Sequence, residues 1–311
     1  EVFKTPVNKI RLFEHGAPGS QNLKLTRKYY TEDMPDGRVK HIVQNITDPD
    51  IVPYIPDGIG NSTDRQRIPA VLIIPGGAFR RLVYNFEGED VAKWLNSMGI
   101  AAFVLECRLP SDEHDNAEDV PLIDAMRAMR VIRGRAQEFG IDEAKIGVMG
   151  FSAGGFMAAL LSTAYESDVY ADYKYKDEYD KLSARPDFAV CSYPVISIDD
   201  CIEAGKRYMS EEQVLERISD SKAKILHKYN PDKLVRPDMP PVFICETDDD
   251  RTTLSENSVG FYMAARKAGV SAELHIFRTG GHGYGCGDDF AQTGEWKVLF
   301  TKWIKSIGII S

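Results

Sequence analysis

Residues 146–161 read Ile146-Gly-Val-Met-Gly150-Phe-Ser152-Ala-Gly154-Gly-Phe-Met-Ala-Ala-Leu-Leu161. The first four residues have the apolar pattern of a buried strand, and residues 155–161 continue with the pattern of an apolar helix. Between them, Gly150-x-Ser152-x-Gly154 is typical of a tight strand-to-helix turn that exposes a serine. Chance alone produces this spacing in about one chain of this length in ten. The prediction that Ser152 is a nucleophile, rather than part of an ordinary glycine-rich turn, therefore rests on the flanking strand and helix.

Around this stretch, from about residue 70 onward, short apolar runs alternate with longer amphipathic ones. This alternation is typical of βαβ units around a mainly parallel sheet with helices on both faces. The predicted strands are 70–74, 101–105, 146–149, 188–192, 242–245 and 273–277. The predicted helices are 88–98, 122–139, 153–164, 255–268 and 294–307. The apolar residues of helix 122–139 share one face, so we interpret them as core: Leu122, Ala125, Met126, Met129 and Ile132.

The remaining segments are predicted to belong to the same single domain, residues 1–311. In residues 1–65, turn-forming sequences such as Thr47-Asp-Pro49 separate short β-like runs. These runs predict antiparallel strands that extend one edge of the sheet. Residues 197–238 form a polar, mostly helical insertion, which is either a lid above the sheet or a solvated spacer.

Composition narrows the classes of partner. The chain has 311 residues, of which 43% are hydrophobic and 27% charged, and this balance suits a well-filled core. The net charge of -9 disfavours nucleic-acid binding, which requires a basic surface. The longest apolar runs are far shorter than the roughly 20 residues that span a bilayer, so no membrane segment is expected. Nothing in the pattern predicts an oligomeric state.

Cysteine usage and the first residue bear on cofactors and compartment. The five cysteines are scattered, with no CxxC pair and no histidine at zinc-ligand spacing. We therefore expect neither a metal site nor a disulfide framework, and no cofactor. Glu1 in place of a methionine has two interpretations. Removal of a signal peptide would place the protein in the periplasm or outside the cell, whereas a trimmed chain would be cytoplasmic.

A serine nucleophile needs hydrogen-bond donors for the oxyanion that forms on its substrate. Pro75-Gly-Gly-Ala-Phe79 follows the predicted strand 70–74, and its glycines allow backbone N–H groups to turn toward a bound carbonyl. We predict Gly77 and Ala78 as donors, completed by Ala153. An ordinary βα turn would explain the glycines but not their place after this strand.

Candidate substrate contacts surround these loops. Phe79, Arg80 and Arg81 either line the substrate pocket or only cap the following turn, and Phe151 adjoins the nucleophile. A tyrosine-rich segment follows the nucleophile helix. Its rings either stack on sugars or pack the loop: Tyr165, Tyr170, Tyr173, Tyr175 and Tyr179.

The nucleophile also needs a base. Of the six histidines, only His282, in Gly280-Gly-His-Gly-Tyr284, lies in a loop after the last predicted strand. His275 lies within that strand, so a structural or surface role is expected for it. The others lack the required context: His15, His41, His114 and His227.

An acid must orient this base. Three consecutive aspartates, Asp248 to Asp250, end the predicted strand 242–245, and the resulting chain order of Ser, Asp and His is typical of one hydrolase fold. Position alone does not choose among the three. Asp199 and Asp200, after strand 188–192, are the main rivals, and Glu246 is a weaker one.

Four motifs together resemble a known family. They are Gly88-Glu-Asp-Val-Ala-Lys-Trp-Leu-Asn96, Arg108-Leu-Pro110, Gly150-Phe-Ser-Ala-Gly-Gly155, and Glu273-Leu-His-Ile-Phe277 followed by Gly-Gly-His-Gly. Over residues 46–306 the chain is similar to α/β-hydrolases of the acetylxylan-esterase and feruloyl-esterase-like carbohydrate esterases. The resemblance implies the α/β-hydrolase fold, with a mainly parallel central sheet, helices on both faces and an antiparallel N-terminal edge.

The resemblance also chooses the acid. In those relatives a segment like HGTxDxxVPxxNS carries it, and aligning the end of that segment on Glu256-Asn257-Ser258 places the acid on Asp250, with Asp249 as the alternative. The chain departs from the pattern in three places. Glu246-Thr247 replaces His-Gly, Thr253-Leu254 replaces Val-Pro, and Ala78 replaces the third glycine of the oxyanion loop.

We therefore expect a serine hydrolase that cleaves carboxylic esters through an acyl-enzyme, with the triad Ser152, His282 and Asp250. The resemblance implies deacetylation of a carbohydrate, so the expected partner is a small-molecule or carbohydrate ester. Two alternatives stay open. One is a peptidase or amidase of the prolyl-oligopeptidase type, and the other is a carbohydrate-binding relative that has lost turnover.

Overall fold

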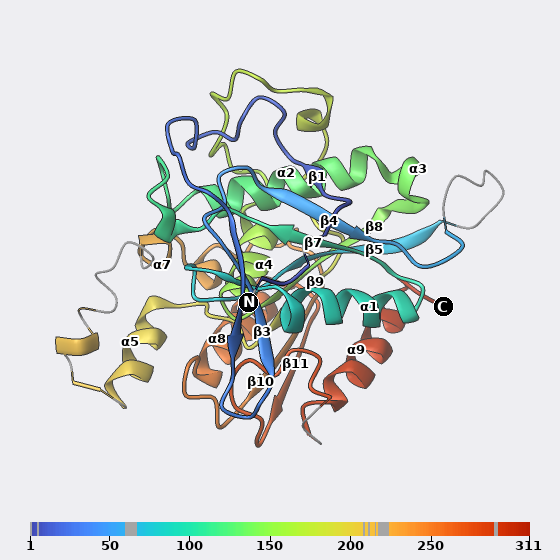
Figure 1. The fold of residues 1–311 in the computed structure, drawn as a ribbon. Helices are drawn as coiled ribbons and strands as arrows, with labels where there is room; N and C mark the ends of the chain where they lie inside the picture. The colour runs from blue at the N-terminus through green and yellow to red at the C-terminus, as the bar shows by residue number, and fades with distance from the viewer. Residues whose placement is uncertain are drawn as a thin grey trace.

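The structure is a computed structural model that describes residues 2–4, 6–59, 67–207, 209–210, 212–214, 216, 224–288 and 292–311. Within these residues, an eight-stranded sheet of order β1-β4-β7-β5-β8-β9-β10-β11 forms the centre of the molecule (Figure 1). Neighbouring strands from β7 to β11 are parallel, and β4 and β1 are antiparallel at one edge. The strands are β1 Ile10–Arg11, β4 Asp50–Tyr54, β7 Ala101–Glu106, β5 Ile68–Ile74, β8 Ile141–Phe151, β9 Ala189–Ser192, β10 Val242–Thr247 and β11 Ala272–Phe277.

The parallel strands contain the short apolar runs of the sequence, and most of their residues are buried because helices cover both faces. All six predicted strands are confirmed, although β8 begins five residues earlier than expected. In the β5–β8 pair, Ile73 lies opposite Met149 and Ile74 opposite Gly150. This register brings the residues that follow both strands to the same carboxyl edge of the sheet, where open α/β sheets bind ligands.

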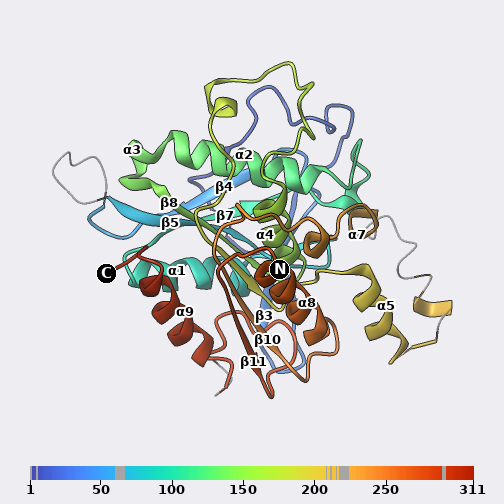
Figure 2. The ribbon, with the colours of Figure 1, turned by 180° about the vertical axis from the view of Figure 1, so that it is seen from behind.

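Helices pack on both faces of the sheet. Figures 1 and 2 show α2, α4 and α8 on one face and α1 and α9 on the other. The predicted core stripe of helix 122–139 is buried, but the structure divides this helix at Arg135 into two. The helix after Ser152 has the predicted bounds. The helices are α1 Asp90–Ser97, α2 Val120–Gly134, α3 Ala136–Phe139, α4 Ala153–Ala164, α8 Ser255–Lys267 and α9 Glu295–Ser306.

The N-terminal strands divide between two sheets. β1 and β4 form the predicted antiparallel edge of the central sheet. In contrast, β2 (Lys28–Asp33) and β3 (Val39–Gln44) do not extend that sheet. They form a hairpin that pairs with β6 (Leu82–Val83), because Ile42 and Val43 of β3 lie opposite Val83 and Leu82. The second sheet therefore lies beside the loop that follows β5.

The insertion predicted at 197–238 begins with α5 (Ile198–Lys206) and includes α7 (Lys224–Lys228). Residues 208, 211, 215 and 217–223 of the insertion lie outside the described part of the chain. The choice between a lid and a spacer stays a prediction. None of the helices in the described part of the chain is both long and apolar enough to cross a membrane.

Candidate active site

Ser152 lies in a strained turn between β8 and α4. Its backbone has φ 55° and ψ -118°, a combination that L-residues rarely adopt outside functional turns. The two glycines of the motif allow this turn. A Cβ on Gly150 would lie 1.9 Å from the Gly154 carbonyl oxygen, and a Cβ on Gly154 would lie 1.9 Å from the Ile74 carbonyl oxygen. Only glycine allows such close backbone approach on both sides of the serine.

The predicted oxyanion loop, residues 75–79, lies next to this turn. Ala78 and Phe79 both have positive φ, at 57° and 58°, a conformation that residues other than glycine seldom adopt and that is concentrated at functional sites. Among the hydrogen bonds of the described residues, none uses the N–H group of Gly77, Ala78 or Ala153 as donor. These three predicted donors are therefore available to a ligand.

His282 approaches Ser152 from the loop after β11. Its Nε2 atom lies 2.9 Å from Ser152 Oγ, which is hydrogen-bond distance. The imidazole side chain is 21% exposed, so one edge of the ring remains open to a substrate. The other five histidines lie outside this constellation. For example, His275 pairs with Glu273 on β11, as expected for a structural or surface histidine.

Asp250 completes a continuous chain of hydrogen bonds. Its Oδ2 atom lies 2.7 Å from Nδ1 of His282, and its Oδ1 atom accepts from the backbone N–H groups of Thr252 and Thr253 at 2.7 and 2.9 Å. Burial opposes ionisation of this carboxyl. The hydrogen bond and charge of His282, together with the backbone donors, outweigh burial, so the pKa of Asp250 is lowered from its usual value. Asp250 is therefore an ionised partner for an imidazolium.

The rival acids have other contacts. Asp249 accepts hydrogen bonds from the backbone N–H groups of Gly280 and Gly281, at 3.0 and 2.8 Å, and so fixes the loop of His282. Asp248 is exposed. Glu246 is buried at the end of β10, and burial together with the nearby charge of Asp250 raises its pKa well above the usual value. Asp199 and Asp200 lie in the first turn of α5, and within the described residues no hydrogen bond or ion pair joins either of them to His282.

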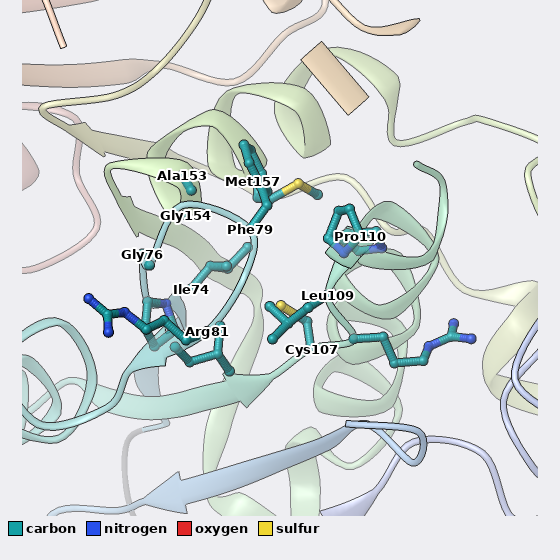
Figure 3. A pocket seen from close by; sticks show the side chains of 15 residues that line it. Ile74, Gly76, Phe79, Arg81, Cys107, Leu109, Pro110, Ala153, Gly154 and Met157 are labelled. Carbon is teal, nitrogen blue, oxygen red and sulfur yellow. The ribbon is translucent and has the colours of Figure 1, made fainter. Parts of the chain in front are cut away.

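A small apolar cavity lies beside the oxyanion loop (Figure 3). It has a volume of about 10 Å³, which is room for roughly one water molecule. Phe79 and Arg81 line it together with Cys107, Leu109 and Met157. In Figure 3, Ala153 and Gly154 at the start of α4 lie at its upper side.

The other predicted contacts lie elsewhere. Arg80 is exposed, and its carbonyl accepts a hydrogen bond from Gln44. Phe151 is fully buried, with its ring packed against Tyr193 and Trp296, so we do not retain it as a substrate contact. The sequence places it next to Ser152, but alternation along β8 directs its side chain into the core.

The tyrosine-rich loop mainly packs on itself and its neighbours. The hydroxyl groups of Tyr165, Tyr170 and Tyr173 donate to Asp238, Asp180 and the Gly16 carbonyl, respectively. Tyr175 is the most exposed of the large apolar side chains in this loop, at 41%. These contacts favour the packing interpretation over a sugar-stacking platform.

Two residues beside the triad, Thr253 and Tyr193, were not predicted. Thr253 donates to Asp250 Oδ2 at 2.9 Å and therefore satisfies a second site on the acid. Tyr193 follows β9 with φ 36°, and its ring lies edge-on to the His282 ring at 5.0 Å between centroids. Thr253 replaces the valine of the family segment, and this departure was the sequence signal that could have identified it. No sequence pattern marked Tyr193.

The chain is similar to known proteins. The BD-FAE family profile matches residues 59–264, which is more than half of the chain. The chain belongs to the BD-FAE family. Ser152 lies within the matched region and His282 lies beyond its end.

Curated relatives of this BD-FAE protein include longer enzymes. The acetylxylan esterase of Xylanibacter ruminicola is 31% identical over 240 residues, which are 76% of this chain and 45% of the relative. The endo-1,4-beta-xylanase B of Butyrivibrio fibrisolvens is 31% identical over 227 residues, which are 73% of this chain and 34% of the relative. The chain thus spans less than half the length of the curated relatives it matches.

Solved structures show the same fold. The acetyl ester-xyloside bifunctional hydrolase of Caldicellulosiruptor lactoaceticus has a TM-score of 0.71 and 35% identity, with 97% of both chains covered. An esterase of Thermogutta terrifontis has a TM-score of 0.66 and 23% identity, with 94% of this chain and 96% of that chain covered. The second likeness concerns the fold alone. This BD-FAE chain therefore has the α/β-hydrolase fold predicted from its sequence.

Proposed function

We propose that this protein hydrolyses carboxylic esters through an acyl-enzyme on Ser152. The observation that carries the proposal is the chain of hydrogen bonds from Asp250 through His282 to Ser152, with distances of 2.7 and 2.9 Å. Such a chain presents the serine hydroxyl to a base whose orientation is fixed by an ionised acid. The names of similar proteins, an acetylxylan esterase and an acetyl ester-xyloside hydrolase, agree with ester hydrolysis.

Each residue then has a distinct step. Ser152 Oγ attacks the ester carbonyl carbon while Nε2 of His282 accepts the hydroxyl proton. The oxyanion that forms receives hydrogen bonds from the N–H groups of Gly77, Ala78 and Ala153. When the C–O bond to the alcohol breaks, His282 returns the proton to the departing oxygen. Water, deprotonated by His282, then attacks the acyl-enzyme and releases the carboxylic acid and free Ser152.

We propose an acetyl group on a carbohydrate as the substrate. In this proposal the methyl of the acetyl group enters the apolar cavity lined by Gly77, Ala153 and Met157, whose volume of about 10 Å³ favours a methyl group over a long acyl chain. Phe79 and Met157, both buried, restrict its size. Deacetylation of a xylan fragment also fits the names of the acetylxylan esterase and acetyl ester-xyloside hydrolase relatives.

A substrate panel tests the proposal. Acetylated xylo-oligosaccharides, a methyl feruloyl ester and a peptidyl 4-nitroanilide are each incubated with the wild-type chain and with Ser152→Ala. We expect acetate release from the acetylated sugar by the wild type alone. Faster turnover of the anilide would favour a peptidase or amidase. Reaction with none of the substrates, together with sugar binding, would favour a non-catalytic relative.

A further inference from the structure

Glu87 is a buried carboxyl group that lies between two loops of the candidate site. Glu87 is only 4% exposed. It lies in a π-helical turn, Asn85–Glu89, that directly precedes α1. Single π-helical turns are rare and occur frequently at functional sites. Burying a carboxyl group is costly unless hydrogen bonds compensate for lost water. Both carboxyl oxygens of Glu87 accept such hydrogen bonds.

One carboxyl oxygen contacts the oxyanion loop. Oε2 of Glu87 accepts a hydrogen bond from the backbone N–H group of Gly76 at 2.8 Å. Gly76 directly precedes Gly77 and Ala78, which carry two of the proposed oxyanion donors. A Cβ on Gly76 would lie 2.7 Å from Glu87 Oε2 and 2.9 Å from Ser152 Cβ. The carboxyl group and the nucleophile thus both pack against the same glycine, which Figure 3 shows in the loop after Ile74.

The other carboxyl oxygen reaches the histidine loop through a tyrosine. Tyr193 donates its hydroxyl proton to Glu87 Oε1 at 2.9 Å. The same hydroxyl oxygen accepts from the backbone N–H group of Gly285 at 3.0 Å, three residues after His282. The Tyr193 ring also lies edge-on to the imidazole of His282. A single side chain therefore connects the loop of the oxyanion donors with the loop of the base.

Charged groups near Glu87 come from separate elements. His282 approaches from the loop after β11 and Lys40 from β3, and both favour the ionised carboxylate. Burial has the larger effect and raises the pKa of Glu87 from its usual value. Because burial has the larger effect, the surroundings of Glu87 disfavour a negative charge beside the position proposed for the oxyanion.

We propose that Glu87 is a positioning residue of the Ser152 site, which holds the oxyanion loop through Gly76 and the histidine loop through Tyr193. The inference rests on the proposed function. Together the two contacts of Glu87 fix the spacing between the proposed oxyanion donors and His282. This spacing matters most when the oxyanion forms. Its loss lowers kcat and leaves KM nearly unchanged, because ground-state binding does not use the aligned donors.

Conservative substitutions of Glu87 and Tyr193 distinguish a positioning role from a role in folding. Glu87→Gln keeps the shape of the side chain but offers one acceptor oxygen instead of two. Tyr193→Phe removes the link to Gly285 and leaves the Gly76 contact in place. Glu89→Gln is the matched control, because Glu89 lies two residues away and pairs with Lys93, and its side chain has no hydrogen bond or ion pair to either loop within the described residues. The double variant Glu87→Gln/Tyr193→Phe tests whether the two residues act as a unit.

The experiment uses the full chain and measures kcat and KM for 4-nitrophenyl acetate, the rate of fluorophosphonate labelling at Ser152, and Tm. For Glu87→Gln and for Tyr193→Phe we expect kcat and the labelling rate to fall about 10- to 100-fold, with KM within about twofold. The double variant should lose little more than the worse single variant. Glu89→Gln should match the wild type in every measurement.

Two results are distinguishable. Wild-type protein that is not labelled at Ser152 would overturn the proposed function and the inference with it. Wild-type protein that is labelled, with Tyr193→Phe and Glu87→Gln as active as Glu89→Gln, would overturn the inference alone. If Glu87→Gln does not fold, Tyr193→Phe decides, and full activity in that variant would overturn the inference.

Discussion

Asp250 and His282 are joined by a hydrogen bond of 2.7 Å between Oδ2 and Nδ1, although Asp249 occupies the adjacent position in the chain. The side chain of Asp250 is fully buried, and Thr253 donates to the same Oδ2 atom. Asp249 is exposed and accepts from two glycine N–H groups of the histidine loop instead. The two adjacent aspartates thus have different roles. Asp250 orients the imidazole, and Asp249 holds the loop of His282 in place.

Asp250→Asn should reduce kcat for 4-nitrophenyl acetate by about four orders of magnitude, because an amide at this position favours the wrong imidazole tautomer. Asp249→Asn is the matched control. Its amide oxygen can still accept from the Gly280 and Gly281 N–H groups, so the loss of activity should be less than tenfold. Steady-state kinetics at one pH compare the two variants. The reverse ranking would move the acid to Asp249.

The cavity beside the oxyanion loop should control the preference for short acyl groups. Met157→Ala removes a buried side chain from its wall, so the ratio of kcat/KM for butyrate to that for acetate should rise by about tenfold. Met129→Ala is the control, because Met129 is buried on α2 but does not line the cavity. Both variants should lose about 2–5 kcal/mol of unfolding free energy. An unchanged ester preference in Met157→Ala would place the acyl group elsewhere.

Asp112 should make stability depend on pH. Burial raises its pKa to about 6, against one backbone hydrogen bond from Ile46. A carboxyl whose folded pKa is raised binds its proton more tightly when folded, so this group favours folding at low pH, and that contribution is lost as the pH rises through about 6.

Asp112→Asn mimics the protonated form. At pH 7.5 it should raise the unfolding free energy by up to about 1 kcal/mol, a value discounted for the partial exposure of the group. The gain should shrink as the pH falls from 6 to 4. Urea unfolding at these pH values measures it. A gain that is larger at pH 4 than at pH 7.5 would contradict the raised pKa.

Much of the fold could be predicted because it depends on local patterns. Each buried parallel strand is a short apolar run, and α4 has the predicted bounds because Ser152 sets its start. The separate sheet of β2, β3 and β6 could not be predicted in this way. Its third strand, Leu82–Val83, has two residues and pairs with a hairpin about 40 positions earlier. Such non-local pairing leaves no periodic signal in so short a segment.

The residues of the site also differ in whether a local sequence pattern reveals them. Ser152 and His282 stand out because each follows a strand within a glycine-rich motif. Glu87 does not, because the acidic run Glu87-Gly-Glu-Asp90 resembles the exposed start of a helix. Only the π-helical turn directs Glu87 inward to Gly76 and Tyr193. Phe151 shows the opposite case, since its neighbour is the nucleophile but its own side chain is part of the core.

The most direct test of the central claim is covalent labelling of the wild-type chain with a fluorophosphonate, followed by peptide mass spectrometry. We expect one modified serine, Ser152, and no labelling of Ser152→Ala, whose ester hydrolysis should fall by about six orders of magnitude. Ser162→Ala is the control, because this buried serine of α4 donates only to the Ala158 carbonyl and should leave labelling intact. Ester hydrolysis retained in Ser152→Ala, or a label on another serine, would contradict the account.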